Sequence, residues 1–207
     1  MDLDTWLAFT MASTVLLIIP GPTILTVIGY SVSHGYSAKV PLIIAVALGD
    51  STALALSLLG LGALMAESAF WFQMVKWAGG LYLLFLGARL LMARVKLSGV
   101  QQDLQMVLGW KLFFNTYLVT ALNPKGIVFF VAFLPLFIDS SSNVIQQLWL
   151  LAVTFVALAT LNATLYAIFA GKARRLLSSP QTRRNFNFAG GSMLFAAGIW
   201  ALSAKQT

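Results

Sequence analysis

Two proline-containing motifs interrupt long apolar segments of this chain, and their residue types suggest a binding site. They are Pro20-Gly21-Pro22 and Asn123-Pro124-Lys125. Proline removes a backbone donor and clashes with the preceding turn, so it kinks or breaks a helix. In a bilayer such a break survives only where it is buried in protein or lines a polar cavity, because freed carbonyl groups cannot reach water. Paired breaks in the two halves of a chain indicate the substrate site of a transporter, so we expect a small-solute carrier.

Two charged residues, Asp50 and Lys125, lie deep within the apolar segments. Charges at such depth are functional candidates by default. An isolated buried carboxylate is costly, so Asp50 must face a wet cavity, pair with a cation or be protonated. We expect it to bind the ammonium group of a substrate or to carry a coupling proton. The alternative is a structural ion pair with Lys125.

A new helix is expected to begin after each proline motif, and these two helix starts predict where a substrate carboxylate would bind. A helix N-terminus presents free N–H groups and the positive end of the helix dipole. Lys125 adds an ammonium group to one restart, and Thr23 and Thr26 lie beside the other. We therefore expect the carboxylate of an amino acid at the breaks and its amine at Asp50. Asn162 lies near the mirror position of Asp50 in the second half, where it either lines the cavity or only bonds a neighbouring helix.

Composition places the chain in the membrane class. Hydrophobic residues make up 59% and charged residues 9% of the 207 residues, whereas about a quarter of the residues of a soluble domain are charged. The absence of cysteine excludes disulfides, and the single histidine, His34, leaves too few soft ligands for a zinc or copper site. We expect no cofactor. The net charge of +7 is concentrated in short loops, which is typical of membrane topology and not of nucleic-acid binding.

The hydropathy pattern predicts an all-α integral membrane protein with a single transmembrane domain over residues 1–207. The first apolar segment does not resemble a cleavable signal peptide, because Asp2 and Asp4 precede it in place of basic residues. Six segments have the length that a bilayer requires. The expected spans are 4–30, 40–65, 71–93, 112–138, 147–170 and 186–203.

A weak internal repeat predicts the arrangement of these spans. Ala78-Gly79-Gly80 with Gly87 recurs as Ala189-Gly190-Gly191 with Gly198, and the two proline breaks recur at a similar shift. The expected repeats are residues 1–100 and 104–207. Because each repeat holds three spans, the second would be inverted relative to the first. The glycines predict close helix packing, either against the equivalent helix of the other repeat or against a second subunit in a homodimer.

Loop charges predict the orientation. Most cations lie in the first, third and fifth loops: Lys39, Arg94, Lys96, Lys111, Lys172, Arg174, Arg175, Arg183 and Arg184. The opposite side has Lys76 and Lys205. Positive loops stay in the cytoplasm, so both termini are expected outside.

Together these motifs resemble the LysE/RhtB family of bacterial amino-acid exporters along nearly the whole chain. The marks are Pro20-Gly21-Pro22, His34-Gly35-Tyr36, Gly49-Asp50, Lys76-Trp77-Ala78-Gly79, Asn123-Pro124-Lys125 with Phe129, and Phe133 to Ile138. The resemblance implies a multi-pass protein of the bacterial inner membrane, in which the outside termini that the loop charges predict would lie in the periplasm. It also implies export of amino acids or their derivatives, driven by the proton motive force. Few acidic residues inside the spans favour neutral amino acids over dibasic ones.

Other functions fit the residues less well. A metal-ion carrier would need several oxygen ligands. One deep aspartate supplies few of them, and the lysine beside the break argues against a cation site. A membrane enzyme would need a nucleophile with a positioned base, for which only a Ser-Lys pair using Lys125 remains. A structural subunit would leave the deep charges unexplained, and a channel would transport without dependence on a gradient.

Overall fold

The computed structural model describes residues 1–67, 74, 77, 81, 84–85, 87–89, 91–92, 109–139 and 141–203. Every regular element within these ranges is a helix, as the composition predicted. Most of the expected third span, 71–93, lies outside the described residues.

The first expected span is a broken helix. Helix α1 (Leu3–Ile18) begins after Asp2, whose Oδ1 accepts a hydrogen bond of 2.8 Å from the N–H of Thr5. It ends before Pro20, and α2 (Pro22–His34) restarts with proline at its first position, where the missing N–H costs nothing. The predicted break is therefore confirmed. A short 3₁₀ turn, η1 (Gly35–Ala38), follows, and Gly35 has the positive φ of 68° that glycine tolerates best.

The second predicted break is also confirmed. Helix α5 (Gly109–Ala121) stops before Pro124, and α6 (Pro124–Val128) restarts at it. The chain continues as a π-helical turn, η2 (Phe129–Phe133), and a 3₁₀ turn, η3 (Leu134–Phe137). The remaining helices are α3 (Lys39–Glu67), α7 (Val144–Ile168), α8 (Ala170–Ser178) and α9 (Pro180–Ser203).

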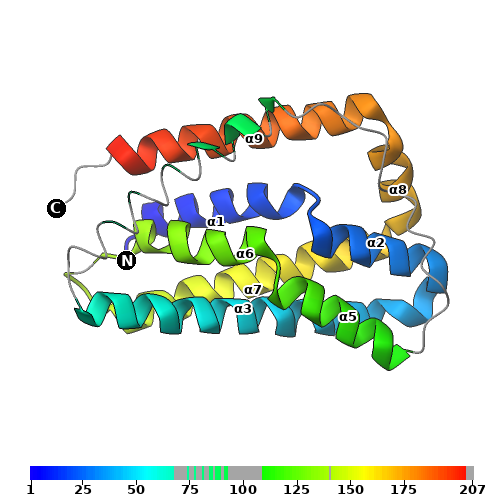
Figure 1. Cartoon of the computed structure of the whole chain (residues 1–207), viewed down its shortest axis with the longest axis horizontal. Helices are drawn as coiled ribbons and strands as arrows, with labels where there is room; N and C mark the ends of the chain where they lie inside the picture. Colours follow the sequence, from blue (N-terminus) through cyan, green and yellow to red (C-terminus); the bar gives the residue numbers. More distant parts are fainter. Residues whose placement is uncertain are drawn as a thin grey trace.

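The helices run roughly along a common direction, except α8, which runs across them (Figure 1). In that view α1 and α2 follow one another along one line, and α5 and α6 along another, so both breaks lie near the middle of the molecule. The start of α1 and the end of α9 lie at one end. The turn between α2 and α3, the start of α5 and the whole of α8 lie at the other end. That end holds Lys39, Lys111 and the cations of α8.

Within the described residues, three stretches are long and apolar enough to cross a membrane: Pro22–Gly60, Gly109–Phe137 and Val144–Ile168. Helix α1 is a shorter apolar helix. The protein is thus an all-helical membrane protein, and six spans in two inverted repeats remain a prediction.

Aromatic packing holds the half of the molecule that contains α1, the segment after Pro124, and α7. Phe9 of α1 meets the ring of Phe137 edge-on, with 5.4 Å between centroids, and Phe130 meets Phe155 of α7 in the same way at 4.7 Å. All four side chains are buried. This cluster fixes α6 and the turns after it against α1 and α7, and so fixes the position of Lys125.

Glycines allow the closest helix contacts, as predicted. A Cβ atom on Gly49 of α3 would lie 2.7 Å from Cβ of Thr120 on α5. A Cβ atom on Gly87, in the expected third span, would lie 2.6 Å from the backbone nitrogen of Phe195 on α9. This glycine therefore contacts α9 of the same chain, the helix that covers the expected sixth span.

Candidate functional site

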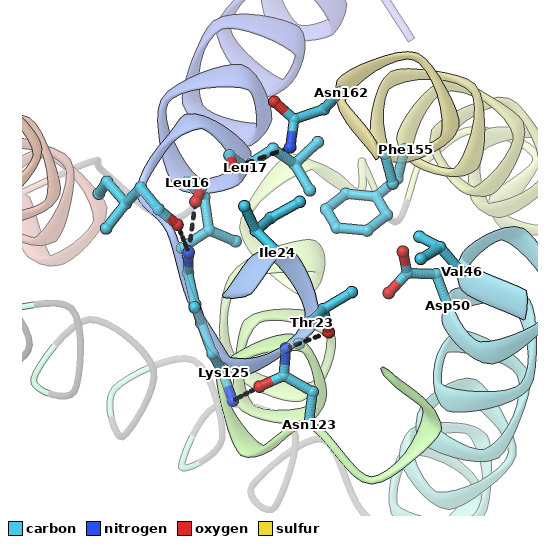
Figure 2. Close-up of a pocket in the computed structure, with 14 residues that line it drawn as sticks. Leu16, Leu17, Thr23, Ile24, Val46, Asp50, Asn123, Lys125, Phe155 and Asn162 are labelled. Atoms are coloured by element: carbon cyan, nitrogen blue, oxygen red, sulfur yellow. Dashed lines mark hydrogen bonds between the residues drawn. The ribbon is translucent and has the colours of Figure 1, made fainter. Parts of the chain in front are cut away.

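A small cavity lies between the two proline breaks and is lined by α1, α2, α3, α6 and α7 (Figure 2). Its volume is about 40 Å³, whereas one water molecule needs roughly 10–15 Å³. Six of the nine predicted site residues line it: Gly21, Thr23, Asp50, Asn123, Lys125 and Asn162. The three prolines, Pro20, Pro22 and Pro124, do not line the cavity but set where the flanking helices end and begin. The cavity accommodates water and is too small for an amino acid in this conformation.

Lys125 binds the end of α1. Its Nζ donates hydrogen bonds to the carbonyl oxygens of Leu16, at 2.5 Å, and Ile19, at 2.7 Å (Figure 2). The last carbonyl groups of a helix have no partner within it and carry the negative end of its dipole. Gly21 lies beside the lysine, since a Cβ atom there would be in van der Waals contact with Cδ of Lys125, at 3.4 Å. The ammonium group therefore caps α1 in this conformation and is not free for a carboxylate.

Two side chains of α7 cap the remaining carbonyl groups at the end of α1. Asn162 donates from Nδ2 to the oxygen of Leu17 at 3.0 Å, and Tyr166 donates from Oη to the oxygen of Ile18 at 2.9 Å. Asn162 thus does both things that the sequence left open: it lines the cavity and bonds a neighbouring helix. Tyr166 was not predicted from the sequence. A signal was available, because residues four apart share a helix face and Tyr166 follows Asn162 by one turn.

Asn123 connects the two breaks. Its Oδ1 accepts a hydrogen bond from the backbone N–H of Lys125 at 3.1 Å and so caps α6. Its Nδ2 donates to Oγ1 of Thr23 on α2, also at 3.1 Å (Figure 2). The N-terminus of α6 is therefore occupied by a side chain of the protein itself.

The N-terminus of α2 differs, because its N-cap residue, Gly21, has no side-chain hydrogen bond to offer. The first N–H groups of a helix lack partners within it. Thr23 and Ile24, which follow Pro22, both line the cavity. Of the two restarts, α2 is the one that leaves backbone donors for an anion.

Asp50 extends from α3 towards the cavity (Figure 2). The residue is 9% exposed. Figure 2 shows its carboxylate near Phe155 and Val46, on the other side of the view from Lys125. Among the described residues, no hydrogen bond or ion pair reaches this carboxylate, so the alternative of a structural ion pair with Lys125 is not what this conformation shows. The carboxylate is therefore an acceptor to which no described residue donates.

Comparison with known proteins assigns the chain to a family. The family model described as LysE type translocator matches residues 14–205. The chain belongs to the LysE type translocator family. Its members are transporters and not enzymes, which agrees with the sequence analysis.

Three LysE relatives show how far the similarity extends. An uncharacterized membrane protein of Vibrio cholerae is 30% identical, over 99% of this chain and all of its own length. The homoserine/homoserine lactone efflux protein of Salmonella typhimurium is 30% identical, over the full length of both chains. The leucine efflux protein of Salmonella choleraesuis is 29% identical, over 66% of this chain and 64% of its own. No solved structure matches.

Proposed function

We propose that this protein exports amino acids or close derivatives from the cytoplasm. The observation that carries the proposal is the buried Asp50 carboxylate, which faces the cavity between two broken helices and receives no hydrogen bond from the part of the chain that the structure describes. A relative that matches the full chain is named for efflux of homoserine and homoserine lactone. A relative that matches two thirds of the chain is named for efflux of leucine. These three compounds share an amino group, which is the group that a carboxylate binds.

The nine predicted residues form the transport site in this proposal. They are Pro20, Gly21, Pro22, Thr23, Asp50, Asn123, Pro124, Lys125 and Asn162. Asp50 binds the substrate ammonium group, and the uncapped start of α2 binds the carboxylate of an amino acid such as homoserine or leucine, or the ester carbonyl oxygen of a lactone. Asp50 is the cavity's one carboxylate among the described lining residues, so a neutral amino acid, with a single cationic group, fits better than a dibasic one.

The cavity must widen before an amino acid can enter, since its volume of about 40 Å³ holds little more than water. We infer a cycle of alternating access, in which two inverted three-helix repeats rock about the site and the proton motive force drives export. The cationic end of the molecule faces the cytoplasm of a bacterial inner membrane, with both termini in the periplasm. Association into a homodimer would use a surface other than the buried Gly87.

The test is transport by the purified protein in proteoliposomes. Vesicles loaded with unlabelled homoserine or leucine should take up the labelled compound by exchange, with a rate that saturates. Asp50→Asn should abolish this exchange. Ser51→Ala is the matched control, because Ser51 is adjacent on α3 and bonds its own helix at the oxygen of Ala47; it should keep the native rate. Exchange by Asp50→Asn at the native rate would contradict the assignment.

A further inference from the structure

The ammonium group of Lys125 occupies a position where a transporter could hold a free cation. The C-terminal ends of broken helices bind Na⁺ or protons in other transporters, because their carbonyl oxygens are unpaired. Here Nζ of Lys125 lies 2.5 and 2.7 Å from the oxygens of Leu16 and Ile19 at such an end. The cation is therefore tethered to α6 of the same chain.

We propose that Lys125 carries the coupling proton of the transport cycle, while Asp50 binds the substrate. This inference rests on the export function proposed above. On the outer side, the lone pair of the neutral amine takes a proton from hydronium and forms an N–H bond. On the inner side, the ammonium group returns that proton to water as substrate binds. One proton moves inward in each cycle: an O–H bond of hydronium breaks outside as the N–H bond forms, and the N–H bond breaks inside as an O–H bond of hydronium forms.

The geometry explains how the proton would control α1. Hydrogen bonds from an ionised donor are roughly twice as strong as neutral ones. The other caps on the end of α1, from Asn162 and Tyr166, come from α7 and are neutral amide and hydroxyl donors. Losing the proton therefore weakens the link between α1 and α6 while the links to α7 persist. The two broken helices can then separate at the cavity that lies between them.

The surroundings of Lys125 also explain why substrate would expel the proton. Among the described residues lining the cavity, Asp50 on α3 is the other ionisable group, and Tyr166 on α7 faces the same helix end. From α9, Gly190 packs against Ile19 and brings no charge. While the cavity is empty, the negative charge of Asp50 attracts the ammonium group of Lys125. A substrate ammonium group on Asp50 cancels that attraction and adds a like charge, so the lysine releases its proton.

Calorimetry on the purified full-length protein tests the assignment. Binding of homoserine, and separately of leucine, is measured in two buffers that differ in ionisation enthalpy, which gives the number of protons released per bound probe. We expect about one proton for the native protein and none for Lys125→Arg, because arginine keeps the charge but does not deprotonate. Lys111→Arg is the matched control, since Lys111 is exposed at the start of α5; it should release as many protons as the native protein.

The other outcomes are equally decisive. Proton release by Lys125→Arg at the native level would overturn the assignment. Loss of probe binding in a folded Lys125→Arg would overturn it too, because the lysine would then act on the substrate. If Lys125→Arg fails to fold, Lys125→Met gives the same readout, with no proton release expected. If the native protein binds neither probe and exports no amino acid, the proposed function itself fails.

Discussion

Replacing Asn123 should weaken the connection between the two broken helices by a predictable amount. In Asn123→Ala, α6 loses its N-cap and Thr23 loses the donor that bonds it across the cavity. Loss of an N-cap side chain costs about 1 kcal/mol. A hydrogen bond between membrane helices contributes about 0.6 kcal/mol on average. The free energy of unfolding should therefore fall by about 1.6 kcal/mol, or roughly fifteenfold in the equilibrium constant.

A double-mutant cycle separates the two contributions. Thr23→Val removes the acceptor of the bridge but leaves the cap on α6 intact, so it should cost about 0.6 kcal/mol. The double variant should cost no more than Asn123→Ala alone, because the bridge is already lost. The free energies come from denaturant titrations in mixed micelles, followed by helical circular dichroism. Strict additivity of the two single variants would refute the bridge, and an effect of Asn123→Ala no larger than that of Thr23→Val would refute the cap.

Two further predictions concern packing and pH. Gly87→Ala should lower the midpoint of thermal unfolding, because the new Cβ atom would lie 2.6 Å from the backbone nitrogen of Phe195. Gly60→Ala is the control and should leave the midpoint unchanged, because a Cβ atom there meets no atom within 4 Å. Equal midpoints for the two variants would contradict the contact of Gly87. Hydrogen bonds from Ser141, and then from Ser142, lower the pKa of Asp139. The turn should therefore be stable above the unfolded pKa of about 3.9 and lose protection as pH falls through the lower folded value. Hydrogen exchange at the Ser141 amide should show this loss in the native protein but not in Asp139→Asn, and a native amide insensitive to acid would count against it.

The proline positions predicted the helix breaks, and the sequence also predicted six of the residues that line the cavity. Proline dictates where α1 and α5 stop whatever surrounds it, and the described helices agree with the expected spans to within a few residues at most ends. An exception is α8: the expected loop after residue 170 is a helix, and α9 begins at Pro180 and not near 186. Similar depth in the apolar segments was enough to place Asp50 and Lys125 at one cavity.

The partners of those residues could not be predicted. Lys125 bonds carbonyl groups that every residue possesses, so nothing in the sequence distinguishes Leu16 and Ile19 as its acceptors. Only the aromatic packing that fixes α6 against α1 and α7 decides which oxygens it reaches. The same holds for Asn123, whose bond to Thr23 spans a hundred residues of sequence. Local chemistry was therefore enough to select several residues that line the cavity, whereas tertiary packing determines which groups they bond.

The central claim is that Asp50 binds the amino group of the substrate. It is tested most directly by the affinity of the native protein and of Asp50→Asn for leucine and for its 2-hydroxy analogue, measured by equilibrium binding. A hydrogen bond to a charged group contributes about 1.5–3 kcal/mol, so the native protein should bind leucine about 10 to 150 times more tightly than the analogue. Asp50→Asn should bind both with similar affinity. A preference for the amino compound that survives in Asp50→Asn would contradict the account.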